Sequence, residues 1–323
     1  MFSMVWRTLA VGLFTASSVV SCSASNDTRG SAGSAGAATG GSGGDGGVGF
    51  GGMGMGGNGG GAAECPNVDV LFVIDNSGSM ADQQQSLIAS FNGFVKGMQD
   101  RLSGAKSYHV GVVSTDDYGG NNGCGLIGDL ITQTSGPGSS NSTCTPFAGG
   151  GRFLTEAEPN LAAKFSCVAQ LGTGGNSDER PARAAMNALD PVRNAPGACN
   201  AGFSRKDSLL VLVMITDEDD VQDGCDGQTC MSYGSGGTPD EWSATVIKHK
   251  GGIAENIVVL SLIGRKLDNP CGATPASKML GFTNNFGENG FIGDVCAASY
   301  DQFFVDALPV IDKACQNYIP PPK

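Results

Sequence analysis

Two short runs of oxygen-bearing side chains carry the chemistry that this sequence could perform. The first run, DNSGS, places Asp75, Ser77 and Ser79 at alternate positions, and the second begins with Thr216 and Asp217. Carboxylate and hydroxyl oxygens are hard ligands that suit Mg²⁺, Mn²⁺ or Ca²⁺. Where a strand turns into a helix, alternate residues point the same way, so this spacing lets one carboxylate and two hydroxyls converge. The two runs therefore predict a site for a divalent metal.

Each run follows a segment that reads as a buried strand. The segment before the first run is VDVLFVID (Val68 to Asp75), and the segment before the second is DSLLVLVMIT (Asp207 to Thr216). Both are continuously apolar over several residues rather than alternating, which is typical of parallel strands covered on both faces. Ligands of such sheets bind at the carboxyl ends of the strands, so we expect the two runs to meet there.

The remaining pattern alternates strands with helices. Two further strands are expected at Ser107–Ser114 and Asn256–Ile263, and a long amphipathic helix with apolar residues from Leu87 to Leu102 should follow the first run. The other helices are expected over residues 159–170, 177–189, 239–250 and 300–318. This alternation predicts an α/β fold, a doubly wound and mostly parallel sheet with helices on both faces.

Three insertions should enlarge this fold. They are expected at residues 117–151, 222–238 and 268–295. The first is rich in Gly, Asn and Ser, and we expect a hairpin around Leu126 to Thr132, with a disulfide holding the insertion in place.

The two oxygen-bearing runs and their strands resemble the metal-ion-dependent adhesion site of von Willebrand factor type A (vWA) domains. The matching segments are LFVIDNSGSM at the first strand and VLVMITDED at the later central strand. The resemblance implies a vWA/Rossmann-like fold over residues 65–323. It also implies that Ser77 and Ser79 bind the metal directly, and that Asp75 and Asp217 bind it directly or through water.

In that family a Thr from an intervening loop completes the site. The resemblance assigns this role to Thr173, with Asn176 and Ser177 as alternatives that lie nearer the next helix. Mg²⁺ is the ion expected first, and Mn²⁺ or Ca²⁺ are the alternatives. Two carboxylates and neutral hydroxyls leave part of the metal's positive charge uncompensated and one coordination position open. An acidic group of a binding partner can therefore complete its coordination.

The first 22 residues have the pattern of a lipoprotein signal peptide. A short segment with one positive charge precedes an apolar run over residues 8–20, which ends in the sequence VVSC at Cys22. This resembles a bacterial lipobox and predicts lipidation of Cys22. Ordinary cleavage near Ala16 to Ser18 is the alternative.

Residues 23–64 are expected to form a disordered linker. Between Gly30 and Gly61, 18 of 32 residues are Gly, which offers almost no side chain to bury. The vWA-like domain is therefore expected to occupy residues 65–323.

The cysteine count suits an exported protein. There are 11 Cys, and assigning Cys22 to a lipid leaves an even ten within the expected domain. Zinc is not expected, because no pair has C-x-x-C spacing and the chain has only 2 His. Among the possible disulfides we favour Cys225–Cys230 and Cys65–Cys315. The ten disulfide candidates are Cys65, Cys124, Cys144, Cys167, Cys199, Cys225, Cys230, Cys271, Cys296 and Cys315.

Two other features are interpreted as structural. The acidic residues after the second run are Asp219, Asp220, Asp223 and Asp226, which we interpret as a solvated loop, with a second calcium site as the alternative. His109 lies inside an expected strand and is interpreted as a structural histidine.

The net charge of the chain and the predicted metal site together limit the classes of function that the protein can have. A formal charge of −12 argues against nucleic-acid binding. An enzyme is not expected, because a metal-dependent hydrolase would need a second metal or a general base. We expect a lipid-anchored protein of the bacterial cell envelope, at the outer membrane or cell surface. Its vWA-like domain should bind a protein or glycan partner that presents an acidic group. The alternative is a structural component of an envelope assembly with a stabilising metal.

Overall fold

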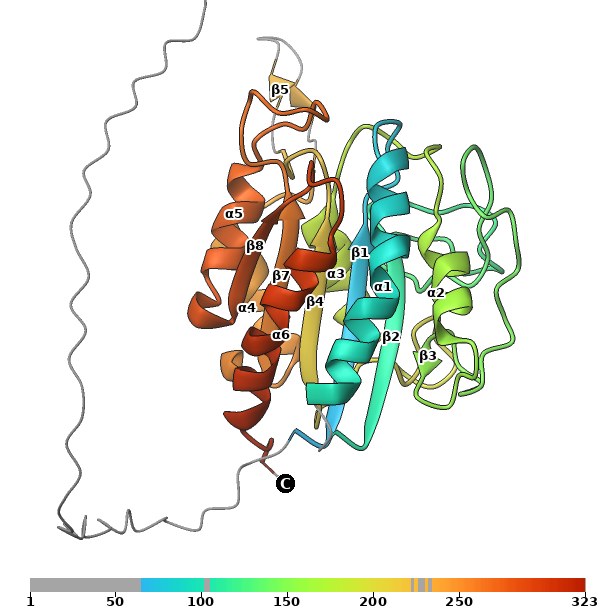
Figure 1. Ribbon diagram of the computed structural model, residues 1–323, viewed down its shortest axis with the longest axis vertical. Helices are drawn as coiled ribbons and strands as arrows, with labels where there is room; N and C mark the ends of the chain where they lie inside the picture. Colours follow the sequence, from blue (N-terminus) through green and yellow to red (C-terminus); the bar gives the residue numbers. More distant parts are fainter. Residues whose placement is uncertain (1–64, 102–104, 222–223, 226–229, 232–233, 323) are drawn as a thin grey trace, which may run out of the picture. The chain divides into compact units, whose positions relative to one another are not determined.

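A six-stranded sheet runs through the protein, and the computed structural model describes it with its covering helices over residues 65–101, 105–221, 224–225, 230–231 and 234–322. The strands lie in the order β3-β2-β1-β4-β7-β8, and all neighbours are parallel except the β2–β3 pair (Figure 1). Their bounds are β1 Asn67–Ile74, β2 Ser107–Ser114, β3 Leu154–Thr155, β4 Leu209–Ile215, β7 Ile257–Ile263 and β8 Gly290–Asp294. A separate antiparallel pair consists of β5 (Gly224–Cys225) and β6 (Cys230–Met231).

Six α-helices accompany the described strands. They are α1 Ala81–Arg101, α2 Leu161–Ala169, α3 Pro181–Leu189, α4 Pro239–His249, α5 Ser277–Asn284 and α6 Asp301–Gln316. Two short 3₁₀ helices are η1 (Ala254–Asn256) and η2 (Gly287–Asn289). Within the described part of the chain, no helix combines the length and the apolar character that crossing a membrane requires.

The two faces of the sheet bury two separate cores because successive strand residues point to opposite sides. On β1, Val70 and Phe72 face α1, α2 and α6, whereas Leu71 and Val73 face α3, α4 and α5. Figure 1 shows α1, α2 and α6 in front of the sheet and α3 behind it. The predicted fold class, a doubly wound and mostly parallel α/β sheet with helices on both faces, is confirmed.

Chain order places the topological switch next to β1. The chain passes from β1 to β2 on one side and then to β4 on the other, so the connections diverge between β1 and β4. Residues Ile74 and Ile215 end these strands and are register partners. The crevice outside such a divergence is where doubly wound sheets bind ligands.

The insertion at residues 117–151 differs from the expectation. The hairpin predicted around Leu126 to Thr132 is wrong, because side chains take the backbone donors that a strand ladder would use. Asp129 accepts a hydrogen bond from the amide of Leu126 at 2.9 Å, and Asp117 accepts one from that of Ile127 at 2.7 Å. Two disulfides hold the insertion, Cys124–Cys199 and Cys144–Cys167.

Two further disulfides join distant parts of the described chain. Cys65 is bonded to Cys315, the pairing that the sequence favoured, and Cys271 is bonded to Cys296. The other favoured pairing, Cys225–Cys230, concerns side chains outside the described residues. The predicted signal peptide, Cys22 and the linker at residues 23–64 also lie outside them.

The segment at residues 268–295 is more than an insertion. It contains α5 and β8, and β8 extends the sheet as a parallel edge strand beside β7. Neither element was predicted, because β8 contains two Gly in five residues and is only half buried along its length.

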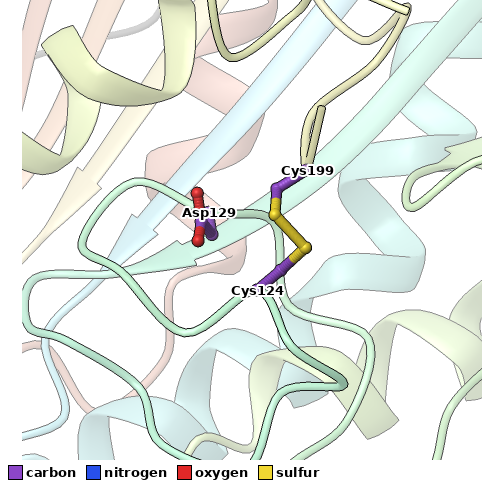
Figure 2. Close-up of side chains that lie close together, drawn as sticks. All are labelled: Cys124, Asp129 and Cys199. Atoms are coloured by element: carbon purple, nitrogen blue, oxygen red, sulfur yellow. A yellow bond between two sulfur atoms is a disulfide. The ribbon is translucent and has the colours of Figure 1, made fainter. Parts of the chain in front are cut away.

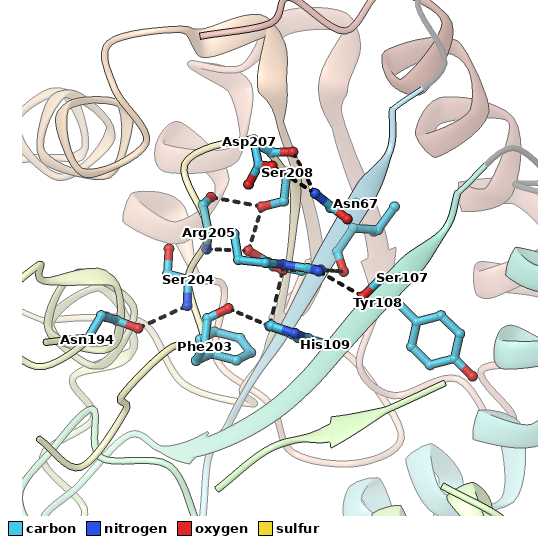
Figure 3. Close-up of polar contacts among 12 residues, drawn as sticks. Asn67, Ser107, Tyr108, His109, Asn194, Phe203, Ser204, Arg205, Asp207 and Ser208 are labelled. Carbon is cyan, nitrogen blue, oxygen red and sulfur yellow. Dashed lines mark hydrogen bonds and ion pairs between the residues drawn. The ribbon is translucent and has the colours of Figure 1, made fainter. Parts of the chain in front are cut away.

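A buried ionic cluster lies where β1 begins, at the edge opposite the ends of β1 and β4 (Figure 3). Asp69 accepts hydrogen bonds from Arg205 Nε at 2.7 Å and from Ser208 Oγ at 2.5 Å. Lys250 is 2% exposed and donates to Ser208 Oγ at 2.8 Å. His109 donates from Nδ1 to the carbonyl oxygen of Phe203 at 2.9 Å, so its interpretation as a structural histidine is confirmed. The cluster anchors β1, the loop before β4 and the end of α4 to one another.

Candidate metal centre

Asp75 follows β1 and is fully buried at the switch point. Its Oδ1 accepts a hydrogen bond from the amide of Ser77 at 2.7 Å, and its Oδ2 accepts one from Thr216 Oγ1 at 2.8 Å. The amide of Asp75 donates to the carbonyl oxygen of Ile215 at 3.0 Å, so pairing with β4 continues one residue past β1. The backbone and both carboxylate oxygens of Asp75 are therefore fixed before any metal binds.

The hydroxyls of Ser77 and Ser79 lie together beside this carboxylate. Their Oγ atoms are 3.2 Å apart, and the Ser79 hydroxyl lies close enough to the side chain of Asp217 to oppose the rise in its pKa. Ser77 is buried, whereas Ser79 is exposed at the surface. Four of the five predicted metal ligands, Asp75, Ser77, Ser79 and Asp217, thus form one connected group from two strand ends.

Asp217 shows that this group fits a cation. Its side chain is 2% exposed, and its Oδ1 is buried without a hydrogen-bond partner among the described residues. An acceptor that has lost water and gained no donor is costly, and a bound cation removes that cost. Burial raises the pKa of Asp217, which is the direction expected for a carboxylate without compensating positive charge.

Glu179 is a carboxyl group at this site that the sequence analysis missed. It precedes α3, is 3% exposed, and accepts a hydrogen bond from Thr115 Oγ1 at 2.5 Å. Its Oε1 is buried without a partner among the described residues. Because Thr115 follows β2, Glu179 adds the end of a third neighbouring strand to the group.

The two carboxyl groups of Glu179 and Asp75 interact directly. The pKa of Glu179 is raised, first by burial and then by the charge of Asp75. Burial is likewise the main reason that the pKa of Asp75 is raised, with the charge of Asp217 adding to it. Three buried acids that disfavour one another's charge form an environment that a divalent cation would stabilise. A Glu directly after a Gly-rich loop and before a helix was the only signal for Glu179 in the sequence.

Thr173, the fifth predicted ligand, is not joined to the other four by any hydrogen bond of the described residues. It is half-buried, its amide donates to the carbonyl oxygen of Pro137 at 2.8 Å, and its hydroxyl lies beside Gly138. The alternatives Asn176 and Ser177 are exposed. Its role as a metal ligand stays a prediction.

The loop that carries Thr173 is nevertheless attached to the loop after β1, which carries Ser77 and Ser79. The amide of Gly175 donates to the carbonyl oxygen of Asn76 at 2.9 Å. A Cβ at position 175 would lie 2.6 Å from the Asn76 side chain, so only Gly allows this approach. Gln84 Nε2 donates to the carbonyl oxygens of Asp75 at 3.0 Å and Gly172 at 2.9 Å, which joins the two loops through α1.

The acidic residues after Asp217 are not all solvated. Asp220 is fully buried and accepts hydrogen bonds from the amide of Ala182 at 2.9 Å and from Ser235 Oγ at 2.6 Å. Asp219 accepts from the amides of Lys278 and Met279 at the start of α5. The interpretation as a solvated loop is therefore wrong for these two residues, whose carboxylates anchor α3 and α5. Asp223 and Asp226 lie outside the described residues.

A second cluster of potential ligands does not form a metal site. The potential ligand atoms of Cys124, Asp129 and Cys199 lie within 4.8 Å of one another. Among the described residues, this is the only such group of three Cys, His, Asp or Glu side chains. Figure 2 shows that the two sulfurs are bonded to each other. A disulfide supplies no thiolate, and Asp129 is ion-paired with Arg193. The cluster is a structural crosslink.

No protein-family model matches the sequence, and no curated protein matches it. Among solved structures, the chain is similar to proximal thread matrix protein 1 from the mussel byssus, with a TM-score of 0.42 and 12% identity over 77% of this chain and 49% of that chain. It is similar to the pilus adhesin SpaC from Lactobacillus rhamnosus GG, with a TM-score of 0.38 and 15% identity over 76% of this chain and 30% of that chain.

A third similar structure is a von Willebrand factor type A protein from Catenulispora acidiphila, with a TM-score of 0.36 and 16% identity over 77% of this chain and 42% of that chain. The chain spans less than half the length of each of these three proteins. Such distant likenesses concern the fold alone and assign no ligand to this chain.

Proposed function

We propose that this protein binds a partner through a divalent metal held at the ends of β1 and β4. The observation that carries the proposal is the buried Oδ1 of Asp217, which has no hydrogen-bond partner among the described residues and lies in one group with Ser77, Ser79 and Asp75. Asp75, Ser77, Ser79 and Asp217 would hold the ion. Mg²⁺ is the first candidate, with Mn²⁺ or Ca²⁺ as alternatives, because the available donors are hard oxygens.

Glu179 extends this set with a third acid, while Thr173 remains the ligand assigned by the resemblance alone. When bound, the metal would supply an electrophilic centre to which an acidic group of a protein or glycan partner adds an oxygen ligand. Ser79, which is exposed, marks the side from which that partner arrives.

We propose binding rather than catalysis at this site. A hydrolytic site needs a group that removes a proton from water. Asp75 is already engaged by Ser77 and Thr216, and the carboxyl group of Glu179 is buried and engaged by Thr115. His109 lies at the opposite edge of the sheet in contact with Phe203. The carboxylates are arranged to hold positive charge.

We also propose that the domain belongs to a lipid-anchored protein of the bacterial cell envelope, at the outer membrane or cell surface. The support is the apolar run that ends at Cys22 and the odd number of cysteines, 11. Replacing Cys22 with Ala should release the protein from the membrane fraction of cells that express it. Unchanged membrane association of that variant would exclude the anchor.

The test of the metal-binding proposal begins with calorimetric titration of the purified protein with MgCl₂, MnCl₂ and CaCl₂. At least one ion should bind with a stoichiometry of about one, as a single site requires. Asp217→Asn should abolish this binding. Asp100→Asn is the matched control, because Asp100 is exposed and, among the described residues, its ion pair is with Lys96 on α1. Equal metal binding by wild type and Asp217→Asn would contradict the proposal.

A capture experiment then addresses the partner. Immobilised protein is incubated with an envelope extract in MgCl₂ or in EDTA, and the retained proteins are compared. Retention that EDTA and Asp217→Asn both abolish supports adhesion through the metal. Retention that neither affects supports the alternative, a structural component whose metal serves stability.

A further inference from the structure

The edge of the sheet opposite the metal centre, where β1, β2 and β4 begin, carries a group of exposed basic side chains. Its members are Arg101 at the end of α1, Lys106 before β2, Lys206 before β4 and Lys248 in the last turn of α4. All four are exposed, and none of them forms an ion pair within the described part of the chain. We call this group the basic edge.

The segments that carry the basic edge are bonded to one another. The amide of Lys106 donates to the carbonyl oxygen of Pro66 at 2.8 Å, so the segment before β2 lies against the start of β1. Asn67 Nδ2 donates to Asp207 Oδ2 at 3.0 Å, which holds the segment before β4 at the same place. The buried ionic cluster joins the end of α4 to that segment. The basic edge is therefore one surface.

The acidic side chains around the basic edge do not cancel its positive charge. Asp100 is paired with Lys96, which leaves Asp207, Glu156 and Glu255 as exposed acids without an ion pair within the described chain. The buried ionic cluster beneath adds two basic side chains and one carboxylate. This part of the surface thus carries more positive than negative charge, although the formal charge of the whole chain is −12.

The acids at the metal centre are too far away to change this balance. Acidic side chains at the ends of β1 and β4 that are not fully buried include Asp82, Asp117, Glu218 and Asp219. The eight residues of β1 separate the two edges by about 26 Å. At physiological ionic strength a charge is screened beyond about 8 Å. A charged surface that touches the basic edge therefore interacts with its cations and not with the distant acids.

Helix stability explains only part of this group. Arg101 and Lys248 lie in the last turns of α1 and α4, where a cation stabilises the helix dipole. Lys106 and Lys206 precede strands, so that role does not account for them.

The chain enters the domain at the basic edge. Cys65 lies directly before β1, and its disulfide to Cys315 holds the end of α6 at the same edge (Figure 1). The proposed lipid anchor at Cys22 would therefore be connected to this edge and not to the metal centre. The predicted linker of 42 residues has a root-mean-square span of about 35 Å, so it keeps the edge near a membrane without fixing contact.

We propose that the basic edge docks on a membrane surface rich in anionic phospholipids, with the headgroup phosphates as its ligands. The inference rests on the proposed lipid anchor, which keeps the domain near that surface. It adds an orientation, because docking by this edge turns the metal centre away from the membrane, where a partner can reach it. Each basic residue near an anionic surface strengthens binding by about fivefold. Four such residues bind weakly alone and become effective when the domain is tethered.

The experiment uses the chain without residues 1–22, so that neither the signal sequence nor a lipid contributes, while every described residue is retained. Co-sedimentation is measured with vesicles of phosphatidylcholine alone and of phosphatidylcholine mixed equally with phosphatidylglycerol. The protein should bind the anionic vesicles only, and NaCl should weaken this binding. The double variant Lys106→Gln, Lys206→Gln should bind about tenfold or more weakly, because it loses two cations.

The matched control removes the same charge from the other end of the domain. Arg265 and Lys266 are exposed and follow β7, so they lie at the edge that carries the metal centre. The double variant Arg265→Gln, Lys266→Gln should bind anionic vesicles as wild type does.

Hydrogen–deuterium exchange then locates the contact. Anionic vesicles should slow exchange in peptides that cover residues 105–108 and 204–208, and should leave residues 264–268 unchanged. Protection of residues 264–268 alone would overturn the proposed orientation. Equal binding to both kinds of vesicle, or binding that Lys106→Gln, Lys206→Gln does not weaken, would overturn the basic edge as a docking surface.

Salt separates this proposal from the lipid anchor. In cells that express full-length Cys22→Ala, membrane association that high salt removes supports the basic edge, because a lipid would resist salt. Association that persists in high salt would exclude the anchor at Cys22, whatever the vesicles show. The metal-binding proposal is independent of both results.

Discussion

Thr216 Oγ1 donates a 2.8 Å hydrogen bond to Asp75 Oδ2, so the residue that follows β4 orients the carboxylate that follows β1. The bond can form only when the two strands are in register, with Ile74 opposite Ile215. The proposed metal binding at this edge would therefore depend on the pairing of the two central strands.

Substituting the two aspartates should have different effects on the metal-free protein. Asp75→Ala leaves the amide of Ser77 and the hydroxyl of Thr216 without their acceptor, at a cost of about 1–3 kcal/mol. Asp217→Asn removes a charge whose Oδ1 has no partner among the described residues, so stability in EDTA should be unchanged or slightly higher. Both variants should lose the rise in melting temperature that metal gives wild type. Thermal melts with EDTA or MgCl₂ test this, and a metal-induced rise that persists in both variants contradicts the site.

Glu179→Gln tests the acid that the sequence analysis missed. Burial and the charge of Asp75 raise the pKa of Glu179, so replacing it with a neutral amide should raise the melting temperature in EDTA. If Glu179 helps to hold the metal, the same change should weaken Mn²⁺ binding about tenfold or more, as for other changes that disturb metal ligands. Calorimetry with MnCl₂ measures this effect. Unchanged affinity would assign Glu179 a structural role only.

The disulfides should differ in their contribution to stability. Cys65–Cys315 closes a separation of 250 residues, whereas Cys144–Cys167 closes one of 23. If the main effect is on the entropy of the unfolded chain, replacing the first pair with Ala should cost about 2 kcal/mol more than replacing the second. Chemical denaturation of the two double variants provides the comparison. A larger loss for the 144–167 pair would show that native packing outweighs chain entropy.

The buried side chain of Lys250 should make the free energy of unfolding depend on pH in the alkaline range. Burial lowers its pKa from 10.5 to about 8, although Asp69 partly opposes the shift. A lowered pKa means that between pH 8 and 10.5 the unfolded chain binds more protons than the folded one, so stability rises with pH in that window. The gain in the free energy of unfolding over this window is on the order of 3 kcal/mol, and it is absent below pH 8.

Lys250→Met isolates the effect, because other groups also titrate in this range. The free energy of unfolding of wild type relative to Lys250→Met should increase between pH 8 and pH 10.5, as measured by urea denaturation at each pH. A flat difference would mean that Lys250 stays protonated beside Asp69, Ser208 and Arg205 throughout.

Sequence patterns predicted the parts of the fold that rest on continuous apolar runs. The strands β1, β2, β4 and β7 lie within a residue or two of their expected bounds, because each is buried on both faces. The edge strands were missed because β3 has two residues and β8 is half-exposed, which leaves no periodic signal.

The residues of the candidate metal centre also divide into those that the sequence pattern indicated and those that it did not. Asp75, Ser77, Ser79 and Asp217 could be named as candidate ligands because each lies next to a recognisable strand. Glu179 reaches the centre only through the path of its loop, which Gly175 brings against Asn76. The buried charged residues away from the metal centre could not be predicted from the sequence either. The sequence around Asp69 is that of an apolar strand, and its partners Arg205 and Lys250 are 136 and 181 residues away.

The bond between Cys65 and Cys315 has a mechanical consequence. Tension between the chain before Cys65 and the chain after Cys315 passes through one covalent link and bypasses the sheet. A partner held at the metal site would pull differently, because that site lies at the opposite end of β1 from Cys65. Such a load would act lengthwise on β1 and shear it between β2 and β4, a geometry in which the hydrogen bonds of both ladders resist together.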